Sequence, residues 1–264
     1  MIKEDTNCCL FEFDSENIST RMPDKKDIKL PKIAVMCFFK EIIEKYSELE
    51  NTKLIMESYH DIIPWKFYNT FYKETDIAFC YAPMGAPLCV NIMEDLYMNG
   101  VEFIIACGGC GVLDEIPVGN ILLPTSAIRD EGTSFHYVKP SKEINLNKKS
   151  IEKVKSILND LNIPFKECKT WTTDASKRET PQKISLRKKQ GCSVVEMECS
   201  ALAACAQFRN KQFIELLYSG DILADTSNYD ARGWQFEISA REKLFNISLQ
   251  IASKLTKNYR RKIK

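Results

Sequence analysis

Histidine, long apolar runs and net charge are all scarce in this sequence. The 264 residues include two histidines, and the formal net charge is +1. Two histidines beside one Cys-x-x-Cys pair do not make up a four-ligand zinc site, so no metal is expected. No apolar run approaches the ~20 residues of a membrane span, and a near-neutral chain offers no strongly basic surface. We therefore expect neither a membrane nor a nucleic acid as a partner.

A secretory pattern is also missing, although cysteine is plentiful. The N-terminus is acidic and lacks the charged-then-apolar pattern of a signal peptide. The chain has 11 cysteines, and they lie inside apolar stretches such as Ala78-Phe-Cys80 and Ile104-Ile-Ala-Cys107, where a thiol packs as a small hydrophobic group. This pattern favours a reducing compartment and predicts a cytoplasmic protein.

Short apolar runs that alternate with amphipathic segments predict an α/β protein. The apolar runs 76–81 and 102–106 flank an amphipathic segment over 86–99, which together predict a strand–helix–strand unit. Nothing repeats and no linker divides the chain, so we predict one domain over residues 31–264 after an N-terminal arm over 1–30. Strands are expected near 32–39, 76–81, 102–106, 120–128, 166–171, 192–196 and 211–219, and helices near 41–49, 86–99, 148–161, 181–190, 197–209 and 237–256.

A glycine-rich segment, Cys107-Gly-Gly-Cys-Gly111, follows the strand at 102–106. Clustered glycines let backbone N–H groups approach an anion closely and form a concave nest. A ligand-facing turn, a tight packing turn, and a redox or metal-binding pair of Cys107 and Cys110 all remain open. We favour the ligand-facing turn.

Two polar segments follow later strands. Residues 129–137 bring together an arginine, carboxylates, hydroxyls and a histidine, which favours a functional loop. Alternatively, Arg129 pairs with Asp130 across a loop and His136 fills a gap in the core. Residues 171–180 contain natural turn formers before a proline that can open a helix, so this segment needs no role beyond a helix entry.

Two further segments place carboxylates after buried strands. Val194-Val-Glu-Met-Glu198 delivers Glu196 and Glu198 to the carboxyl end of a strand, where ligands bind in open α/β sheets. Carboxylates at a helix N-terminus are also favoured by the helix dipole alone. Asp221 follows the apolar strand at 211–219 and is expected at the same edge, with Arg232 close enough in sequence to pair with it.

Taken together, these segments resemble the family-1 nucleoside phosphorylases, which include the hexameric purine nucleoside and uridine phosphorylases. The resemblance spans about residues 32–250 and is most specific at 129–137 and at Val195-Glu-Met-Glu198. It implies a three-layer α/β/α sandwich around a central mixed β-sheet and a homo-oligomer, either a dimer or a trimer of dimers. It also implies phosphorolysis of a ribo- or deoxyribonucleoside to a free base and a sugar 1-phosphate, with phosphate as co-substrate and no cofactor. The loop that carries Arg178 resembles the uridine phosphorylase branch.

The resemblance assigns roles to individual residues. Glu198 would accept the protons of the ribose hydroxyls, and Met197 would pack on the sugar. Asp221 would protonate a purine base, and Arg232 would assist it. Nucleoside contacts are expected from Glu196, Met197, Glu198, Arg178, Cys110 and Gly111, and phosphate contacts from Gly108, Gly109, Arg129 and Lys40.

The sequence departs from the family's pattern at two places. The first strand leads into Met36-Cys-Phe-Phe-Lys40 instead of Gly-Asp-Pro-x-Arg, and no arginine occurs between Arg21 and Arg129. Phosphate is held best by the bidentate fork of arginine. The base loop has Ser176 and Lys177 in place of a stacking aromatic residue. A nucleosidase that uses water, with Glu41 as its base, and a catalytically weak nucleoside-binding protein therefore remain alternatives.

Overall fold

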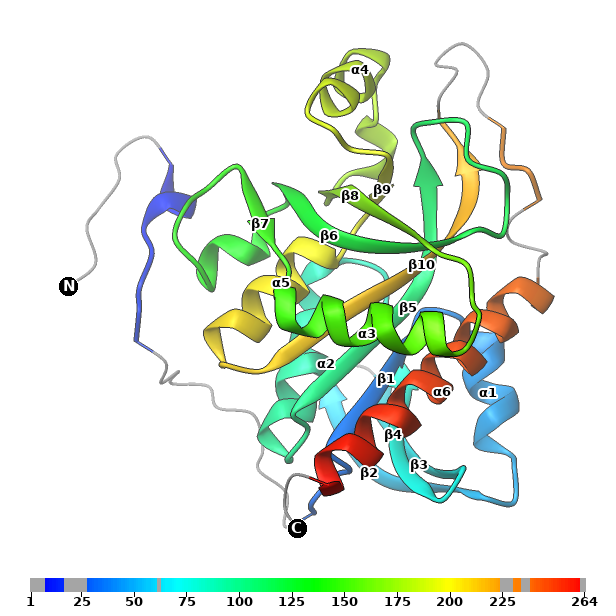
Figure 1. Ribbon diagram of the computed structural model, residues 1–264. Helices are drawn as coiled ribbons and strands as arrows, with labels where there is room; N and C mark the ends of the chain where they lie inside the picture. Colours follow the sequence, from blue (N-terminus) through cyan, green and yellow to red (C-terminus); the bar gives the residue numbers. More distant parts are fainter. Residues whose placement is uncertain (1–7, 17–27, 61–62, 224–229, 234–237, 262–264) are drawn as a thin grey trace.

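The centre of the protein is a ten-stranded mixed sheet, shown by a computed structural model that describes residues 8–16, 28–60, 63–223, 230–233 and 238–261 (Figure 1). The strand order is β10-β6-β8-β9-β5-β1-β4-β3-β2, and β7 lies beside β6. Because β10 also pairs with β5, strands β5, β10, β6, β8 and β9 close into a ring. The strands are β1 (Ile33–Cys37), β2 (Thr52–His60), β3 (Ile63–Tyr72), β4 (Thr75–Tyr81), β5 (Phe103–Val112), β6 (Ile121–Asp130), β7 (Glu143–Asn145), β8 (Lys166–Thr173), β9 (Val194–Glu196) and β10 (Gln212–Ile222).

Helices cover the sheet and complete the three-layer α/β/α sandwich (Figure 1). Helix α6 lies against β1, β4, β5 and β10, with α1 and α3 packed beside it, while α2 and α5 pack against each other. The helices are α1 (Lys40–Ser47), α2 (Ala86–Met98), α3 (Lys148–Asp160), α4 (Pro181–Lys189), α5 (Cys199–Phe208) and α6 (Ile238–Arg261), with short 3-10 turns η1 (Cys9–Phe11), η2 (Thr133–His136) and η3 (Ser176–Arg178).

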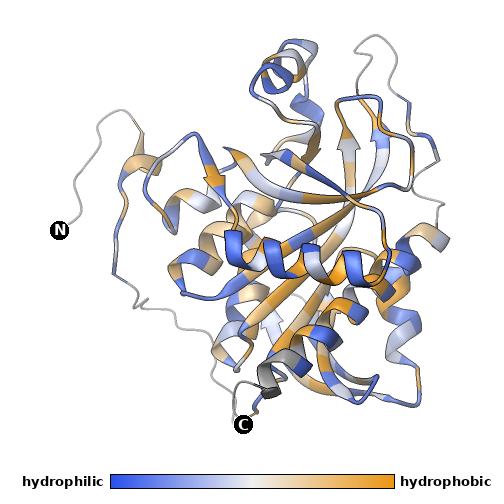
Figure 2. Cartoon of the chain, viewed as in Figure 1, coloured by the Kyte–Doolittle hydropathy of each residue, from blue (hydrophilic) through white to orange (hydrophobic). Residues whose placement is uncertain are grey.

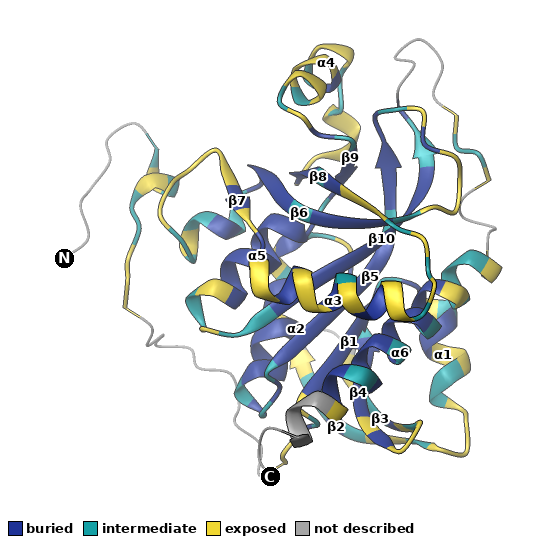
Figure 3. Ribbon diagram, in the orientation of Figure 1, coloured by how far each residue is buried: buried dark blue, intermediate teal, exposed yellow. Residues whose placement is uncertain are grey.

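The apolar runs of the sequence form the buried centre of this sandwich. All five residues of β1 are fully buried, as are the apolar residues of β4 and the first five of β5, and Figures 2 and 3 show these strands as hydrophobic and buried. Helix α3 turns Ile151, Val154 and Leu158 inward and its lysines outward, and the side chain of Asn147 caps its first turn. The predicted strand–helix–strand unit is therefore confirmed as β4–α2–β5.

The hairpin of β2 and β3 was not predicted. Leu54, Tyr59 and Phe71 on these strands are exposed, and the register of the pair shifts between Leu54 and Met56. A bulge of this kind interrupts the alternation of apolar and polar residues on which a strand prediction depends. Elsewhere the β6–β8 register shifts between Pro124 and Ser126, because proline cannot donate a hydrogen bond to a neighbouring strand.

The glycine-rich segment is not a turn. Strand β5 continues to Val112, and Gly108 and Gly109 are paired with Leu217 and Tyr218 of β10. An extended, paired backbone cannot curl into the concave nest of N–H groups that was expected for an anion, because the sheet neighbours already occupy its polar groups. The prediction of a ligand-facing turn at residues 107–111 was therefore wrong, although these residues do face a cavity.

The chain before β1 is described only in part. Phe11 of η1 packs against Phe135, with 6.0 Å between ring centroids, and Leu30 is buried. The peripheral arm over residues 1–30 stays a prediction. All 11 cysteines are free. In the described part of the chain, no helix combines the length and apolarity that a membrane span requires.

Candidate active site

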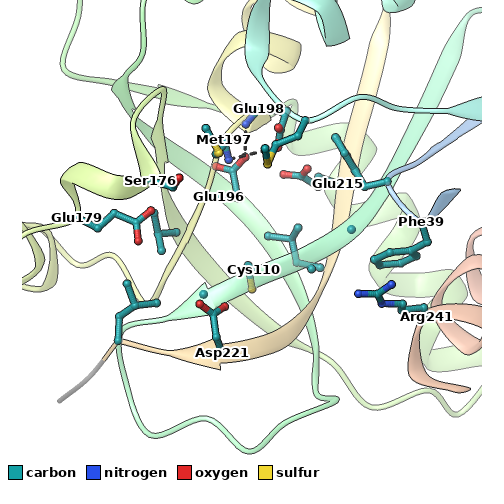
Figure 4. A pocket seen from close by; sticks show the side chains of 18 of the residues that line it. Phe39, Cys110, Ser176, Glu179, Glu196, Met197, Glu198, Glu215, Asp221 and Arg241 are labelled. Atoms are coloured by element: carbon teal, nitrogen blue, oxygen red, sulfur yellow. Dashed lines mark hydrogen bonds between the residues drawn. The ribbon is translucent and has the colours of Figure 1, made fainter. Parts of the chain in front are cut away.

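A cavity of about 320 Å³ opens where β5, β9 and β10 end, between these strands and the connection from the end of β4 to α2 (Figure 4). It collects residues from segments that are far apart in the sequence. Its walls include most of the site residues predicted from the sequence: Gly108, Gly109, Cys110, Gly111, Glu196, Met197, Glu198 and Asp221. Residues that sequence reasoning did not single out also line it: Phe38, Phe39, Tyr81, Met84, Ser176, Glu179, Val195, Glu215, Leu217, Leu223 and Arg241.

Glu196 is the most completely hydrogen-bonded carboxylate of this cavity. Its oxygens accept from the hydroxyls of Thr170 and Thr172 at 3.0 and 2.6 Å, and from the backbone N–H groups of Glu198 and Cys199 at 2.6 Å each. Burial raises the pKa of Glu196, and these donors act in the opposite direction because they stabilise the ionised form. Glu196 therefore joins β8 to the N-terminus of α5 and holds the next two residues in place.

Glu198 points toward the start of α2. Its oxygens accept from the backbone N–H groups of Gly85 at 2.5 Å and of Met197 at 3.2 Å. Gly85 has a φ of 103°, a conformation that residues with a Cβ rarely adopt, so this contact depends on glycine. Burial, followed by the charge of Glu196, raises the pKa of Glu198 to about 8. The carboxyl group therefore titrates just above neutral pH and can accept a proton when it is ionised.

A second pair of acidic groups lies elsewhere on the cavity wall. Asp221, near the end of β10, and Glu179, just after η3, both line the cavity (Figure 4). Burial and then the charge of Asp221 raise the pKa of Glu179 to about 7. A carboxyl group that titrates near neutral pH is suited to general acid catalysis. Ser176 lines the same end, whereas Arg178 is exposed and does not line the cavity.

Aromatic rings lie against the glycines that were expected to face phosphate. A Cβ atom at Gly108 would come within 2.8 Å of the Phe38 ring, and one at Gly109 within 3.1 Å of the Tyr218 ring. Glycine is therefore required here because side-chain rings approach the strand closely. The expected partner Lys40 has a side chain that is 70% exposed and pairs with Glu44 at 3.5 Å, and it does not line the cavity.

Arg129 lies outside the cavity, in a buried network of its own. Its guanidinium donates to the hydroxyls of Ser134 and Ser141, at 2.8 Å each, and to the carbonyls of Lys139 and Val138. It also lies 4.1 Å from the centroid of the Phe135 ring. Its donors are already occupied, so the structure does not place Arg129 where it could hold phosphate.

The segment around Arg129 nevertheless supports the cavity from behind. Glu131 accepts from the backbone of Ser134 at 2.9 Å and from the hydroxyl of Ser200 at 2.8 Å. Ser200 belongs to the first turn of α5, directly after Glu198 and Cys199. The polar motif at 129–137 therefore acts as a structural network that anchors α5.

Among the described residues, the arginine that reaches the cavity is Arg241, from the start of α6. Its guanidinium pairs with Glu41 at 2.6 Å and lies 5.1 Å from the centroid of the Phe39 ring.

Arg232, which was expected beside Asp221, donates to the carbonyls of Ile116 and Gly220 and does not line the cavity. Glu41, the expected base for water, is occupied by Arg241. No spacing rule in the sequence links the α6 arginine to the first strand.

One group of side chains has the ligand types of a metal site. Ligand atoms of Glu196, Cys199 and Glu215 lie within 4.8 Å of one another, and all three residues are buried. The oxygens of Glu196 already accept four hydrogen bonds, which leaves this carboxylate no free lone pair for an ion. The donor set therefore fits a metal poorly.

A family model for the phosphorylase superfamily matches residues 32–252. The chain belongs to the phosphorylase superfamily. A guanosine phosphorylase from Halorubrum lacusprofundi is 36% identical over 74 residues, which are 28% of this chain and 31% of that relative. The chain thus spans about a third of this relative and, at 49%, about half of an uncharacterised protein from Acanthamoeba polyphaga mimivirus.

Solved structures of superfamily members share the fold of this chain. A purine nucleoside phosphorylase from Toxoplasma gondii superposes with a TM-score of 0.76 at 18% identity, covering 92% of this chain and 100% of that one. A uridine phosphorylase from Vibrio fischeri gives 0.73 at 20% identity, covering 89% and 99%. An AMP nucleosidase from Bacteroides thetaiotaomicron gives 0.68 at 18% identity, covering 87% and 90%. The predicted family and the predicted sandwich are both confirmed.

Proposed function

We propose that this chain cleaves the N-glycosidic bond of a nucleoside in the cavity between β5, β9 and β10. The observation that carries the proposal is the placement of Glu198 on one part of the wall and of Asp221 and Glu179 on another, around one ligand-sized space (Figure 4). Glycosidic cleavage passes through a sugar with oxocarbenium character and needs a negative charge near the sugar and a proton for the leaving group. These three residues supply both kinds of group.

In this proposal the sugar lies against Met197 and Glu198. The Glu198 carboxylate accepts hydrogen bonds from sugar hydroxyls and stabilises the positive charge that develops on the ring. Asp221 and Glu179 face the leaving base, and the pKa of Glu179, at about 7, suits a proton donor at neutral pH. Glu196 positions Glu198 through the backbone and does not itself need to touch the nucleoside.

Phosphate is the acceptor that the phosphorylase relatives suggest, and Arg241 is the cation on the wall that could bind it. Phosphorolysis would release a sugar 1-phosphate together with the base. The placement of Lys40 and Arg129 gives neither of them a part in this proposal. Cytoplasmic location, homo-oligomer formation and the absence of a cofactor stay predictions.

Water is a second candidate acceptor, and the scarcity of cations among the described residues of the cavity wall favours it. The wall carries the carboxyl groups of Glu179, Glu196, Glu198, Glu215 and Asp221. Arg241, the guanidinium of the same wall, is paired with Glu41. A dianion is costly to desolvate without matching cations, whereas water carries no charge. An AMP nucleosidase shares the fold, so the sandwich itself accommodates either chemistry.

A nucleoside panel with and without phosphate tests both candidates. Purified protein is incubated with inosine, guanosine, adenosine and uridine, and base release and the sugar product are followed. Sugar 1-phosphate that forms only with phosphate supports phosphorolysis, whereas free ribose at equal rates in both buffers supports hydrolysis. The Glu198→Gln variant is the control for contaminating enzymes. Absence of base release from every nucleoside in both buffers would contradict glycosidic cleavage.

A further inference from the structure

Glu215 is a carboxylic acid in the middle of an otherwise apolar strand. It lies in β10 within Phe213-Ile-Glu-Leu-Leu217, its exposed fraction is 0%, and its side chain lines the cavity. Its partner in the sheet is Ala106 of β5, which offers no polar side chain. A buried glutamate at such a position is rare unless it is paired, so its presence calls for a physical explanation.

Neither carboxyl oxygen of Glu215 has a partner at full hydrogen-bond geometry in the described part of the chain, although both are fully buried. Burial and the neighbouring carboxylates raise the pKa of Glu215 by more than its contact with the Cys199 thiol lowers it. The nearest polar groups are the Cys199 thiol, a weak donor, and the carboxylate of Glu196. Glu196 accepts four hydrogen bonds and Glu198 accepts two. Of these three neighbouring carboxyl groups, Glu215 is thus the one that the protein leaves unsatisfied.

The surroundings of Glu215 keep it neutral. Burial, and then the charges of Glu196 and Glu198, raise the pKa of Glu215 well above its ordinary value. The other titratable groups that face it are the thiols of Cys89, Cys107, Cys110, Cys168 and Cys199 from α2, β5, β8 and α5. A protonated carboxyl group carries one O–H donor, so the wall that carries the acceptor Glu198 also holds a donor.

We propose that Glu215 contacts the ligand as a neutral acid, donating a hydrogen bond to a sugar hydroxyl while Glu198 accepts one, so that the pocket selects ribonucleosides over 2′-deoxyribonucleosides. The inference rests on the proposed function, because it requires the sugar to lie against Glu198. A hydroxyl group is both donor and acceptor. Two adjacent ribose hydroxyls can therefore satisfy a donor and an acceptor on the wall of one cavity, and Glu215 and Glu198 both line it (Figure 4).

The same arrangement rejects a sugar that lacks one hydroxyl. With a 2′-deoxyribonucleoside, one buried polar group of the pair is left without a partner. A site that is built to hydrogen-bond a hydroxyl discriminates strongly against the analogue without it, because the unpaired group stays buried. We expect the wild-type protein to prefer the ribonucleoside by at least about tenfold in kcat/KM.

Two variants of Glu215 separate a neutral donor from a charged carboxylate. Glu215→Gln keeps an N–H donor without a charge, so the preference for inosine over 2′-deoxyinosine should be retained. Glu215→Leu removes the donor, so kcat/KM for inosine should fall more than about tenfold while that for 2′-deoxyinosine changes little. If glutamine behaves like leucine, or if leucine leaves the preference unchanged, the proposal is wrong. Uridine and 2′-deoxyuridine serve as a second pair if the protein prefers pyrimidines.

The pH dependence of the preference for the ribonucleoside distinguishes a hydrogen-bonding role of Glu215 from a merely structural one. As the pH rises and Glu215 loses its proton, the wild-type protein should lose its preference for the ribonucleoside, whereas Glu215→Gln should keep it. A preference that falls equally in both proteins would contradict the proposal.

Binding measurements keep this inference separate from the proposed reaction. If the wild-type protein releases no base from any nucleoside, glycosidic cleavage fails, and the same nucleoside pairs are then compared by calorimetry. Tighter binding of the ribonucleoside that is lost in Glu215→Leu and kept in Glu215→Gln supports the inference even then. Equal affinity of the wild-type protein for both sugars overturns it. Glu215→Met serves as a second apolar variant if leucine does not fold.

Discussion

Two buried polar clusters, one around Arg129 and one at the cavity, differ in how completely their polar groups are hydrogen-bonded. Around Arg129, the guanidinium, Glu131 and Ser134 use their polar groups on one another and on nearby backbone. Around the cavity, Glu215 has no partner at full hydrogen-bond geometry among the described residues, and Glu198 is held only by backbone N–H groups. Satisfied polar groups stabilise a structure, and unsatisfied ones mark where a ligand is expected.

This contrast corrects two predictions from the sequence, one about residues 129–137 and one about β10. The segment 129–137 is dense in polar residues and predicted a functional loop, yet its side chains bond to protein groups, such as Ser200 of α5 and Ser141, and do not line the cavity. Glu215, a single glutamate within an apolar strand, was not predicted as a site residue, yet it lines the cavity. Polar density in a sequence does not distinguish the two, because satisfaction depends on partners that are distant along the chain.

The largest expected effect is a loss of stability when the hydrogen-bonded network around Arg129 is broken. Arg129→Met removes the donors to the hydroxyls of Ser134 and Ser141 and to two backbone carbonyls, and it also removes the positive charge near Glu131. We expect the free energy of unfolding to fall by about 3 kcal/mol, because a buried charge loses its compensation. Urea denaturation measures this. Lys257→Ala, at an exposed pair with Glu74, is the control, and an equally small change in both variants would show that the network is not structural.

The next largest effect is expected from Glu198, the hydrogen-bond acceptor on the cavity wall. Glu198→Gln keeps the size of the side chain but removes the charge that stabilises the sugar cation. Turnover should fall by more than about tenfold, which corresponds to about 1.4 kcal/mol of transition-state stabilisation. Steady-state kinetics on the best nucleoside from the panel measures it, with Glu143→Gln, an exposed carboxylate, as the control. An unchanged rate would remove Glu198 from the mechanism.

The pH profile sharpens the assignment of Glu198. A group with a pKa of about 8 that must be ionised to accept hydroxyl protons makes kcat/KM rise with pH. Between pH 7 and 9 its ionised fraction grows about tenfold, so kcat/KM should rise by about the same factor in the Glu179→Gln background, where the opposing titration of Glu179 is removed. Glu198→Gln should lose this limb of the profile. Glu179→Gln separates the titration of Glu179, whose pKa is about 7. A profile that stays flat over this range in the Glu179→Gln background would contradict the assignment.

The smallest expected effect is a gain in stability when Glu215 is substituted, opposite to the loss expected for Arg129. Glu215→Leu removes an unsatisfied buried acid, so we expect the protein to become more stable, by about 1 kcal/mol. Glu215 has a folded-state pKa above its unfolded-state value, so the folded state binds more protons. The wild-type protein therefore loses stability as the pH rises through that folded-state pKa, and the variant's advantage should grow. Denaturation of both proteins at pH 5 and pH 8 measures the gain in stability and its dependence on pH. If Glu215→Leu were less stable than the wild-type protein at either pH, the prediction would be wrong.

Much of the fold could be predicted because local patterns carry it. Helix α2 follows from its apolar stripe and ends before Gly100, and α4 begins at Pro181 with Thr180 as its cap. The hairpin of β2 and β3 could not be predicted in the same way, since a bulge and several exposed apolar residues obscure its period. The end of β5 was also missed, because glycine weakens a strand locally and only its sheet neighbours extend it.

For the site, the sequence by itself determined the acidic residues that close β9 and β10, because a strand that ends in Glu196 or Asp221 must present them at the sheet edge. Only the tertiary structure decided which groups meet there. Arg241 reaches the cavity instead of Arg232, and Glu215 faces it without a partner at full hydrogen-bond geometry among the described residues. The physical reason is that hydrogen bonding and burial depend on contacts between β5, β9, β10 and α6, and no local sequence pattern encodes such contacts.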